Sequence, residues 1–274
     1  MQELLNHPAI QGGLAPFVVA LLAAVLLRRL RLSGLAIVAG FAVTVFLVSG
    51  FAFEPLTSTR KIIWLGLVSG LLSIPLSLAN WPSSRAFVLM LAAIAAAAAV
   101  WMGARILQQH PAVEAAQWGM GCALYVGWLV YRMDALRDSP VRAATAGLAL
   151  GLGTGAAALI GASALLGLYG LSLGAAAAAY LLILLAGNRP LPCGRSFTLP
   201  IAFIAGLVAC LAVLTAQLPW YALPVLAVIP IAGSLPVPVK NSLWLQSALL
   251  LTATLACAAG AVYLTWRING APPL

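Results

Sequence analysis

Charged residues are scarce in this chain of 274 residues, because Asp, Glu, Lys and Arg together make up only 7% of it. A soluble domain needs about 25% of such residues to present enough polar groups to water. Hydrophobic residues make up 64% of the chain, and the mean hydropathy is +1.08. The composition excludes a soluble globular protein and predicts an all-α polytopic integral membrane protein, solvated mainly by the lipid bilayer.

Acids and histidines are rarer still, with five acids and two histidines against 14 basic residues. The basic residues stand at the ends of apolar runs rather than in one stripe, so they indicate membrane topology and not a nucleic-acid partner. The four cysteines show no C-x-x-C spacing, which gives no reason to expect a disulfide or a structural zinc. The sequence has no nucleotide-binding fingerprint and no hydrolase constellation, which disfavours an enzyme and predicts no bound cofactor.

Ten apolar runs, each of about the length that crosses 30 Å of hydrocarbon, follow one another in a single transmembrane domain, residues 1 to 274. They cover residues 12–29, 33–53, 62–80, 86–106, 115–133, 143–166, 171–187, 199–217, 221–237 and 243–266. Residues 143 to 187 form one apolar stretch, which we divide at residues 167 to 172 because Gly167 and Gly170 permit a tight turn.

The distribution of basic residues sets the expected topology. With the N-terminus outside, ten basic residues fall on the inner side and four on the outer side. We therefore expect a bacterial inner-membrane protein with both termini on the non-cytoplasmic side. The tryptophans stand mostly at the ends of the runs, as interfacial belts do, and we interpret them as markers of depth.

Two short segments recur at nearly the same offset. Residues 73 to 80 align with residues 234 to 241, and residues 100 to 106 align with residues 262 to 268, at offsets of 161 and 162. The shared register predicts a parallel repeat with units 12–106 and 171–268, joined by the runs between 115 and 166. Chance similarity between Ala-, Leu- and Val-rich runs is the alternative.

Residues 224 to 238, in and just beyond the ninth run, contain four prolines, and the repeat mate of that run, the third run, contains one. Proline leaves backbone carbonyls unpaired, and in lipid these persist only where protein or a water-filled cavity meets them. Paired interrupted spans are typical of transport sites, with a kinked but inert helix as the alternative. The predicted substrate path is formed by Ser73, Pro75, Asn80, Pro230, Gly233, Ser234, Pro236 and Asn241.

We expect no buried carboxylate, lysine or histidine in the spans, which disfavours a proton pump because ionisable residues inside a membrane usually mark ion paths. Uncharged groups along the path would suit a neutral or zwitterionic solute.

Both histidines occur in the same short pattern, amide, His, Pro, Ala. His110 and Glu114 are four residues apart, so on a helix they share a face, and with His7 and Glu3 they could form a metal site on the outer surface. The alternative is that Pro8 and Pro111 start two helices, since proline suits the first helical position.

Gly147, Gly151 and Gly155 form the pattern G-x-x-x-G-x-x-x-G. Small residues at this spacing let two helices approach closely, either within one chain or between copies in a homo-oligomer.

Two functions fit these features. The first is a permease or channel-like carrier for a small neutral or zwitterionic solute or a lipid, with its path near the third and ninth runs. The second is a non-catalytic transmembrane subunit or scaffold that packs against a membrane-protein partner.

Overall fold

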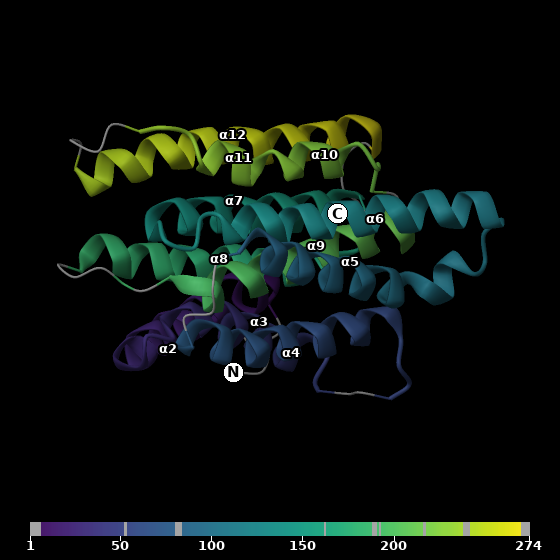
Figure 1. Ribbon diagram of the computed structural model, residues 1–274. Helices are drawn as coiled ribbons and strands as arrows, with labels where there is room; N and C mark the ends of the chain where they lie inside the picture. Colours follow the sequence, from purple (N-terminus) through teal and green to yellow (C-terminus); the bar gives the residue numbers. More distant parts are fainter. Residues whose placement is uncertain are drawn as a thin grey trace.

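Backbone polar groups in apolar surroundings have no water to bind, and the chain satisfies them by forming helices. The computed structural model describes residues 7–51, 54–79, 84–161, 163–187, 191, 193–215, 218–237 and 242–269, and over these residues it is helical without any strand. The elements are η1 (Ile10–Leu14), α2 (Ala15–Leu26), η2 (Leu27–Leu30), η3 (Ser33–Leu35), α3 (Ala36–Val48), α4 (Ser58–Leu78), α5 (Arg85–Leu107), α6 (Ala112–Asp134), α7 (Pro140–Gly161), α8 (Ala164–Ala186), α9 (Gly194–Thr215), α10 (Ala222–Ala227), α11 (Ile229–Gly233) and α12 (Leu243–Asn269). Figure 1 shows them as one bundle of nearly parallel rods.

The predicted all-α membrane fold is confirmed. Seven helical segments of the described chain are long and apolar enough to cross a membrane. The other three predicted spans correspond to helices that do not meet this criterion. Two of them are shorter apolar segments, Ser33–Val48 and Ala222–Gly233, and the third is α6, which is more polar. Ten crossings, the parallel repeat and the orientation of the termini stay predictions.

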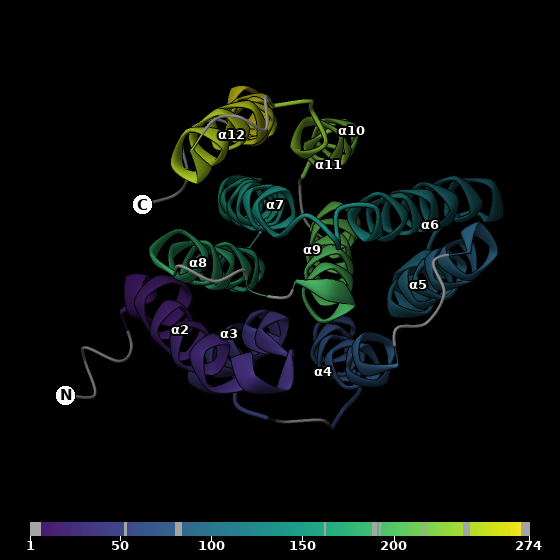
Figure 2. The ribbon, with the colours of Figure 1, turned by 60° about the vertical axis from the view of Figure 1, so that its left-hand side comes forward.

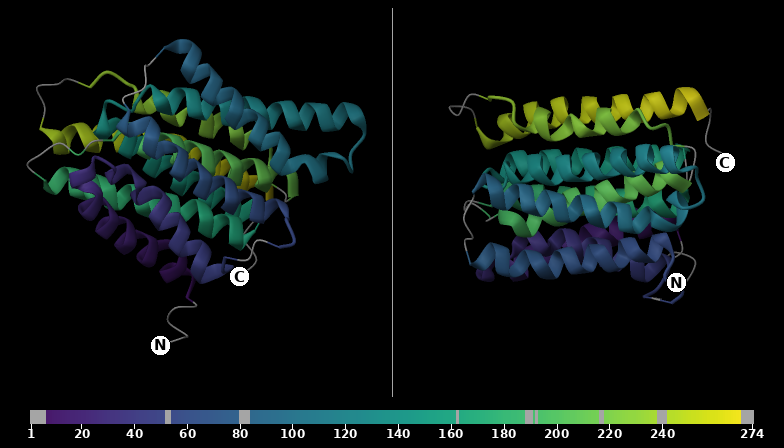
Figure 3. Two further views of the ribbon diagram at one scale, coloured as in Figure 1. Left: turned by 60° about the horizontal axis from the view of Figure 1, so that its bottom comes forward. Right: turned by 45° about the vertical axis from the view of Figure 1, so that its right-hand side comes forward.

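The helices are arranged around α9. Figure 2, which looks nearly along the bundle, places α9 at the centre, with α2, α3 and α4 on one side and α10, α11 and α12 on the other. Figure 3 shows the same order from the side, as outer layers that enclose the middle of the bundle. In α9, 83% of the most apolar stretch is buried, against 28% in α12.

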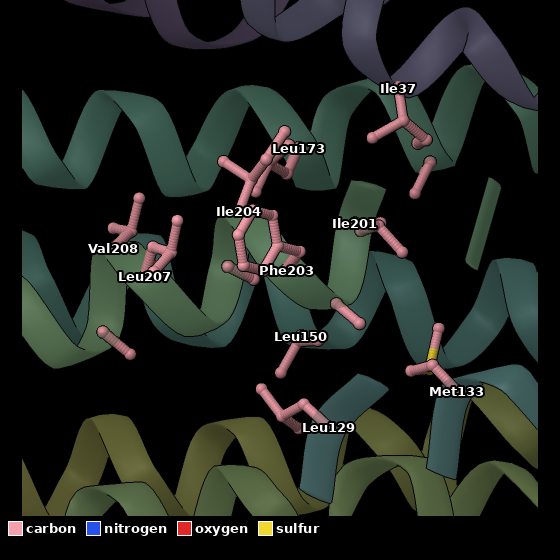
Figure 4. Close-up of a cluster of buried hydrophobic side chains, with 14 of the residues drawn as sticks. Ile37, Leu129, Met133, Leu150, Leu173, Ile201, Phe203, Ile204, Leu207 and Val208 are labelled. Carbon is pink, nitrogen blue, oxygen red and sulfur yellow. The ribbon is translucent and has the colours of Figure 1, made fainter. Parts of the chain in front are cut away.

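Large aliphatic side chains fill the space around α9. Figure 4 shows Ile204 of α9 beside Leu173 of α8, with Leu150 of α7 and Leu129 of α6 on the opposite side of α9. All four are fully buried. The centre of the bundle is therefore a packed hydrophobic core.

Contacts between helix ends show that the chain runs up and down the bundle. Beyond the end of α3, the Ser49 hydroxyl lies 2.9 Å from the Tyr169 hydroxyl, near the start of α8. At the other end of the bundle, the last residue of α6, Asp134, contacts Arg195 near the start of α9. We call this second end, where α6 ends and α7 and α9 begin, the basic end.

The predicted turn at residues 167 to 172 is wrong, because α8 begins at Ala164 and runs through these residues without a break. The glycines serve helix packing instead. A Cβ built on Gly170 would lie 2.5 Å from the Cα of Gly155, and one built on Gly151 would lie 2.7 Å from the Cα of Gly174. Glycine thus lets the backbones of α7 and α8 touch within one chain.

Candidate functional site

A groove of about 820 Å³ lies between α6 and the pair α10–α11, with α9 beneath it. One wall is a single face of α6, which presents Gln117, Gly121, Leu124 and Trp128 at helical spacing. The opposite wall presents Trp220, Leu223, Pro224, Ala227, Val228 and Ile231. Its volume falls in the range of about 300 to 1,000 Å³ that small-molecule sites occupy.

Proline shapes the second wall. Pro224 and Pro230 cannot donate backbone hydrogen bonds, and the helix is divided into α10, which ends at Ala227, and α11, which begins at Ile229. The Ala227 carbonyl accepts a hydrogen bond of 3.0 Å from the Trp128 indole of α6. A side chain from the facing wall thus satisfies a carbonyl at the interruption, as the bilayer requires.

The groove is lined mostly by apolar side chains, and apart from the tryptophans and Cys122 its polar side chains are Gln117 and, in its floor, Tyr125. Tyr125 is 6% exposed, lines the groove, and its hydroxyl has no hydrogen-bond partner among the described residues. Beside it, Cys122 accepts a weak contact of 3.7 Å at its carbonyl from the thiol of Cys210. An unpaired buried hydroxyl costs about 1 to 3 kcal/mol, so the floor of the groove carries an uncompensated polar group.

A cluster of charged residues closes the basic end of the bundle. Asp134 accepts a hydrogen bond of 2.9 Å from Arg195 Nε and one of 3.0 Å from Arg137 Nη1. The Arg195 guanidinium also lies 4.8 Å from the centre of the Phe87 ring of α5. The arginine–aspartate cluster, formed by Asp134, Arg137 and Arg195, therefore ties the ends of α5, α6 and α9 together.

Gly194 lets the backbone at the start of α9 come close to Arg137 of the arginine–aspartate cluster. Its backbone has φ of +57°, a conformation that glycine adopts without strain, and its N–H donates to the Arg137 carbonyl at 3.2 Å. Next to it, Cys193 is almost fully buried, and burial raises the pKa of its thiol well above the usual range.

The expectation of no buried carboxylate or lysine in the spans is wrong. Asp134 is 7% exposed and Lys61 is 5% exposed. Lys61 donates from Nζ to the Trp101 carbonyl at 2.9 Å and lies over the Trp101 ring. Both residues fall just outside the predicted apolar runs, whereas α6 extends to Asp134 and α4 begins at Ser58, so the helices carry them into the bundle.

The residues of the predicted substrate path do not all come together. Figures 1 and 2 place α4, with Ser73 and Pro75, on the opposite side of the bundle from α11. Ser73 is buried and bonds the Gly70 carbonyl of its own helix at 2.7 Å. Asn80 and Asn241 lie outside the described residues.

The other half of the path lies at the basic end of the groove. Pro230 and Gly233 are buried, and a Cβ on Gly233 would lie 2.9 Å from Ala146 of α7, so this part of α11 packs against α7. Ser234 follows α11 and meets two arginine side chains, whereas Pro236 is exposed.

The two histidines start helices and lie apart. Pro8 is the first helical residue after His7, and His7 Nδ1 accepts the Ala9 N–H at 3.2 Å. Pro111 directly precedes α6, one position earlier than expected. His110 Nδ1 is 3.6 Å from Glu114 Oε2, and Figure 2 places the α2 and α6 segments on opposite flanks of the bundle.

A metal site would need further ligands beside His110 and Glu114. Over the part of the chain that the structure describes, no three His, Cys, Asp or Glu residues are grouped to hold a metal ion. Glu3 lies outside the described residues.

The sequence analysis does not predict the groove, although some of the residues that line it form a recognisable pattern in the sequence. Trp118 and Trp220 are interpreted from the sequence as interfacial tryptophans, and the pattern Gln117, Gly121, Leu124, Trp128 marks one face of α6. The sequence does not show that this face lies opposite α10–α11. The two residues in contact, Trp128 and Ala227, are 99 residues apart in the chain, and only the fold brings them together.

No family model, curated protein or solved structure matches this chain.

Proposed function

We propose that this integral membrane protein is a carrier for an amphipathic lipid, which enters the groove between α6 and α10–α11 from the side. The observation that supports the proposal most strongly is the groove itself, an apolar cavity of about 820 Å³. A soluble solute would need a row of polar partners, and this lining offers very few. An acyl chain needs none.

The length of the groove suits a lipid chain. Gln117 and Trp128 are 11 positions apart on the α6 wall, which spans about 16 Å at 1.5 Å per residue. This is about half of a 30 Å hydrocarbon layer, the depth of one leaflet. The interrupted wall formed by α10 and α11 also suits a carrier, because a helix divided by proline can bend where a continuous one cannot.

The proposal is tested with the purified protein in liposomes, by the rate at which a fluorescently labelled phospholipid crosses between leaflets. Leu124→Trp fills the groove, and Leu71→Trp on α4 is its matched control, because both leucines are 67% exposed. We expect wild type and Leu71→Trp to move the lipid at equal rates, and Leu124→Trp to be at least about fivefold slower, about 1 kcal/mol.

Two results would overturn the proposal. One is a wild-type rate equal to that of protein-free liposomes, which would favour the transmembrane-subunit hypothesis. The other is an equal rate for wild type and Leu124→Trp.

A further inference from the structure

Two arginines at the basic end of the groove have no acidic partner among the residues that the structure describes. Among the described residues, no carboxylate oxygen lies within 4.0 Å of the side-chain nitrogens of Arg132 or Arg142. The nearby acids are already engaged, Asp134 by Arg137 and Arg195, and Asp138 by Arg137. Positive charge is therefore in excess at this end of the groove.

Arg132 continues the α6 wall of the groove. It lies one helical turn beyond Trp128, and its guanidinium carbon is 5.6 Å from the centre of the Trp128 ring. Its Nη2 donates to the Ser234 hydroxyl at 3.4 Å, whereas its buried Nε has no hydrogen-bond partner among the described residues. The contacts of the guanidinium beside the groove are thus one long hydrogen bond and a ring contact, and within the described chain one buried nitrogen stays unpaired.

Arg142 reaches the same place from α7. Its Nη1 donates to the Ser234 carbonyl at 3.4 Å, so α6, α7 and the end of α11 bring two guanidinium groups to one serine. Two like charges at a shared residue repel one another, and an anion bound between them would relieve this repulsion. Arginine is also the side chain best suited to phosphate, because its planar donors match phosphate oxygens in pairs.

We propose that Arg132 and Arg142 bind the phosphate of an anionic lipid headgroup while the acyl chain of that lipid occupies the groove. This inference rests on the proposed function, since it identifies the class of lipid that the groove takes. A zwitterionic lipid such as phosphatidylcholine carries the same phosphate with a cation attached, and the excess positive charge disfavours that cation. The protein therefore discriminates by net headgroup charge.

The test measures binding of two lipids with identical acyl chains, phosphatidylglycerol and phosphatidylcholine, to the purified full chain in detergent. We expect wild type to bind phosphatidylglycerol about tenfold more tightly, and Arg132→Gln or Arg142→Gln to reduce this preference to about twofold or less. Arg85→Gln is the control, because it removes an exposed positive charge at the start of α5, on the basic end but outside the groove lining. It should retain the full preference.

The outcomes separate the two proposals. Equal binding of the two lipids by wild type, with both weakened by Leu124→Trp, overturns the headgroup assignment and leaves the groove as a lipid site. Binding of neither lipid overturns the proposed function itself. Displacement of phosphatidylglycerol by inorganic phosphate would overturn the lipid source and indicate a site for free phosphate, whereas retention of the lipid supports the assignment. Loss of the preference in Arg85→Gln as well would show that general surface charge, not these two arginines, selects the lipid.

Discussion

Two helix pairs in this protein differ in how closely they approach. Between α7 and α8, glycines let the two backbones touch, and the Cα of Gly155 lies 2.5 Å from where a Cβ of Gly170 would be. Between α6 and α10–α11, tryptophan and tyrosine side chains line the facing walls and a cavity of about 820 Å³ remains. The size of the side chains at each interface thus decides whether the two helices pack in direct contact or leave room for a ligand.

The largest effect should come from the charged cluster that holds the groove wall α6 against α9. Asp134→Asn removes the carboxylate that the buried Arg195 contacts, and we expect it to lower the free energy of unfolding by about 3 to 5 kcal/mol. Unfolding by a denaturing detergent, followed by circular dichroism, measures this. Asp138→Asn is the matched control, because the Asp138 side chain is 84% exposed, and it should change stability by about 0.5 kcal/mol or less. Equal effects of the two variants would contradict the structural role of the cluster.

The same substitution in the two helix pairs should act with opposite sign. Gly151→Ala places a methyl group against the backbone of Gly174, and we expect a loss of about 1 to 3 kcal/mol. Gly121→Ala in the groove wall has no atom within 4 Å of the new Cβ, so the better helix propensity of alanine should raise stability by about 0.5 to 1 kcal/mol. The same detergent unfolding measures both, and a loss of stability in both variants would show that the groove is as tightly packed as the α7–α8 contact.

A smaller effect is expected for lipid affinity. Trp220→Ala removes an aromatic ring from the groove, and we expect it to weaken phosphatidylglycerol binding about fivefold, since about 1 kcal/mol of apolar contact is lost. Trp244→Ala on α12 is the matched control, because both tryptophans are 60% exposed and Trp244 lies outside the groove lining. An equal loss in both variants would mean that the lipid contacts the whole apolar surface.

The smallest effect is expected at His110 and Glu114. Their side chains are 41% and 56% exposed and 3.6 Å apart, so Glu114→Gln should change the free energy of unfolding by less than about 0.5 kcal/mol. Metal content of the purified wild type, measured by mass spectrometry, is the companion test. Stoichiometric metal that Glu114→Gln removes would restore the metal-site hypothesis.

The sequence predicted the helices well because apolar run length is a local property. The described helices fall on all ten predicted runs, although seven alone meet the length and hydropathy of a membrane span. The division between α7 and α8 was misplaced because Gly167 and Gly170 have two physical uses, in turns and in close helix contacts, which sequence alone does not separate.

The site depended on contacts that no local pattern reveals. The prolines of α10–α11 predict an interrupted helix, which the structure shows, but the local pattern of the facing wall, α6, predicts only a span with one interfacial tryptophan, Trp118. Asp134 lies one residue beyond the predicted span 115–133, and its pairing with Arg195, 61 residues later in the chain, depends on the tertiary fold. The predicted pairing of the third and ninth runs failed to bring one path together because α4 and α11 lie on opposite sides of α9 (Figure 2).

The central claim is that a lipid chain lies between α6 and α10–α11, and photocrosslinking tests it most directly. Phosphatidylglycerol with a photoactivatable diazirine in its acyl chain is bound to the full chain, irradiated, and the modified peptides are mapped by mass spectrometry. We predict that the adducts concentrate in residues 117–128 and 220–231, which line the groove. Adducts spread evenly over the exposed apolar residues of α4, α5 and α12, such as Leu71, Leu89 and Leu249, would contradict the account.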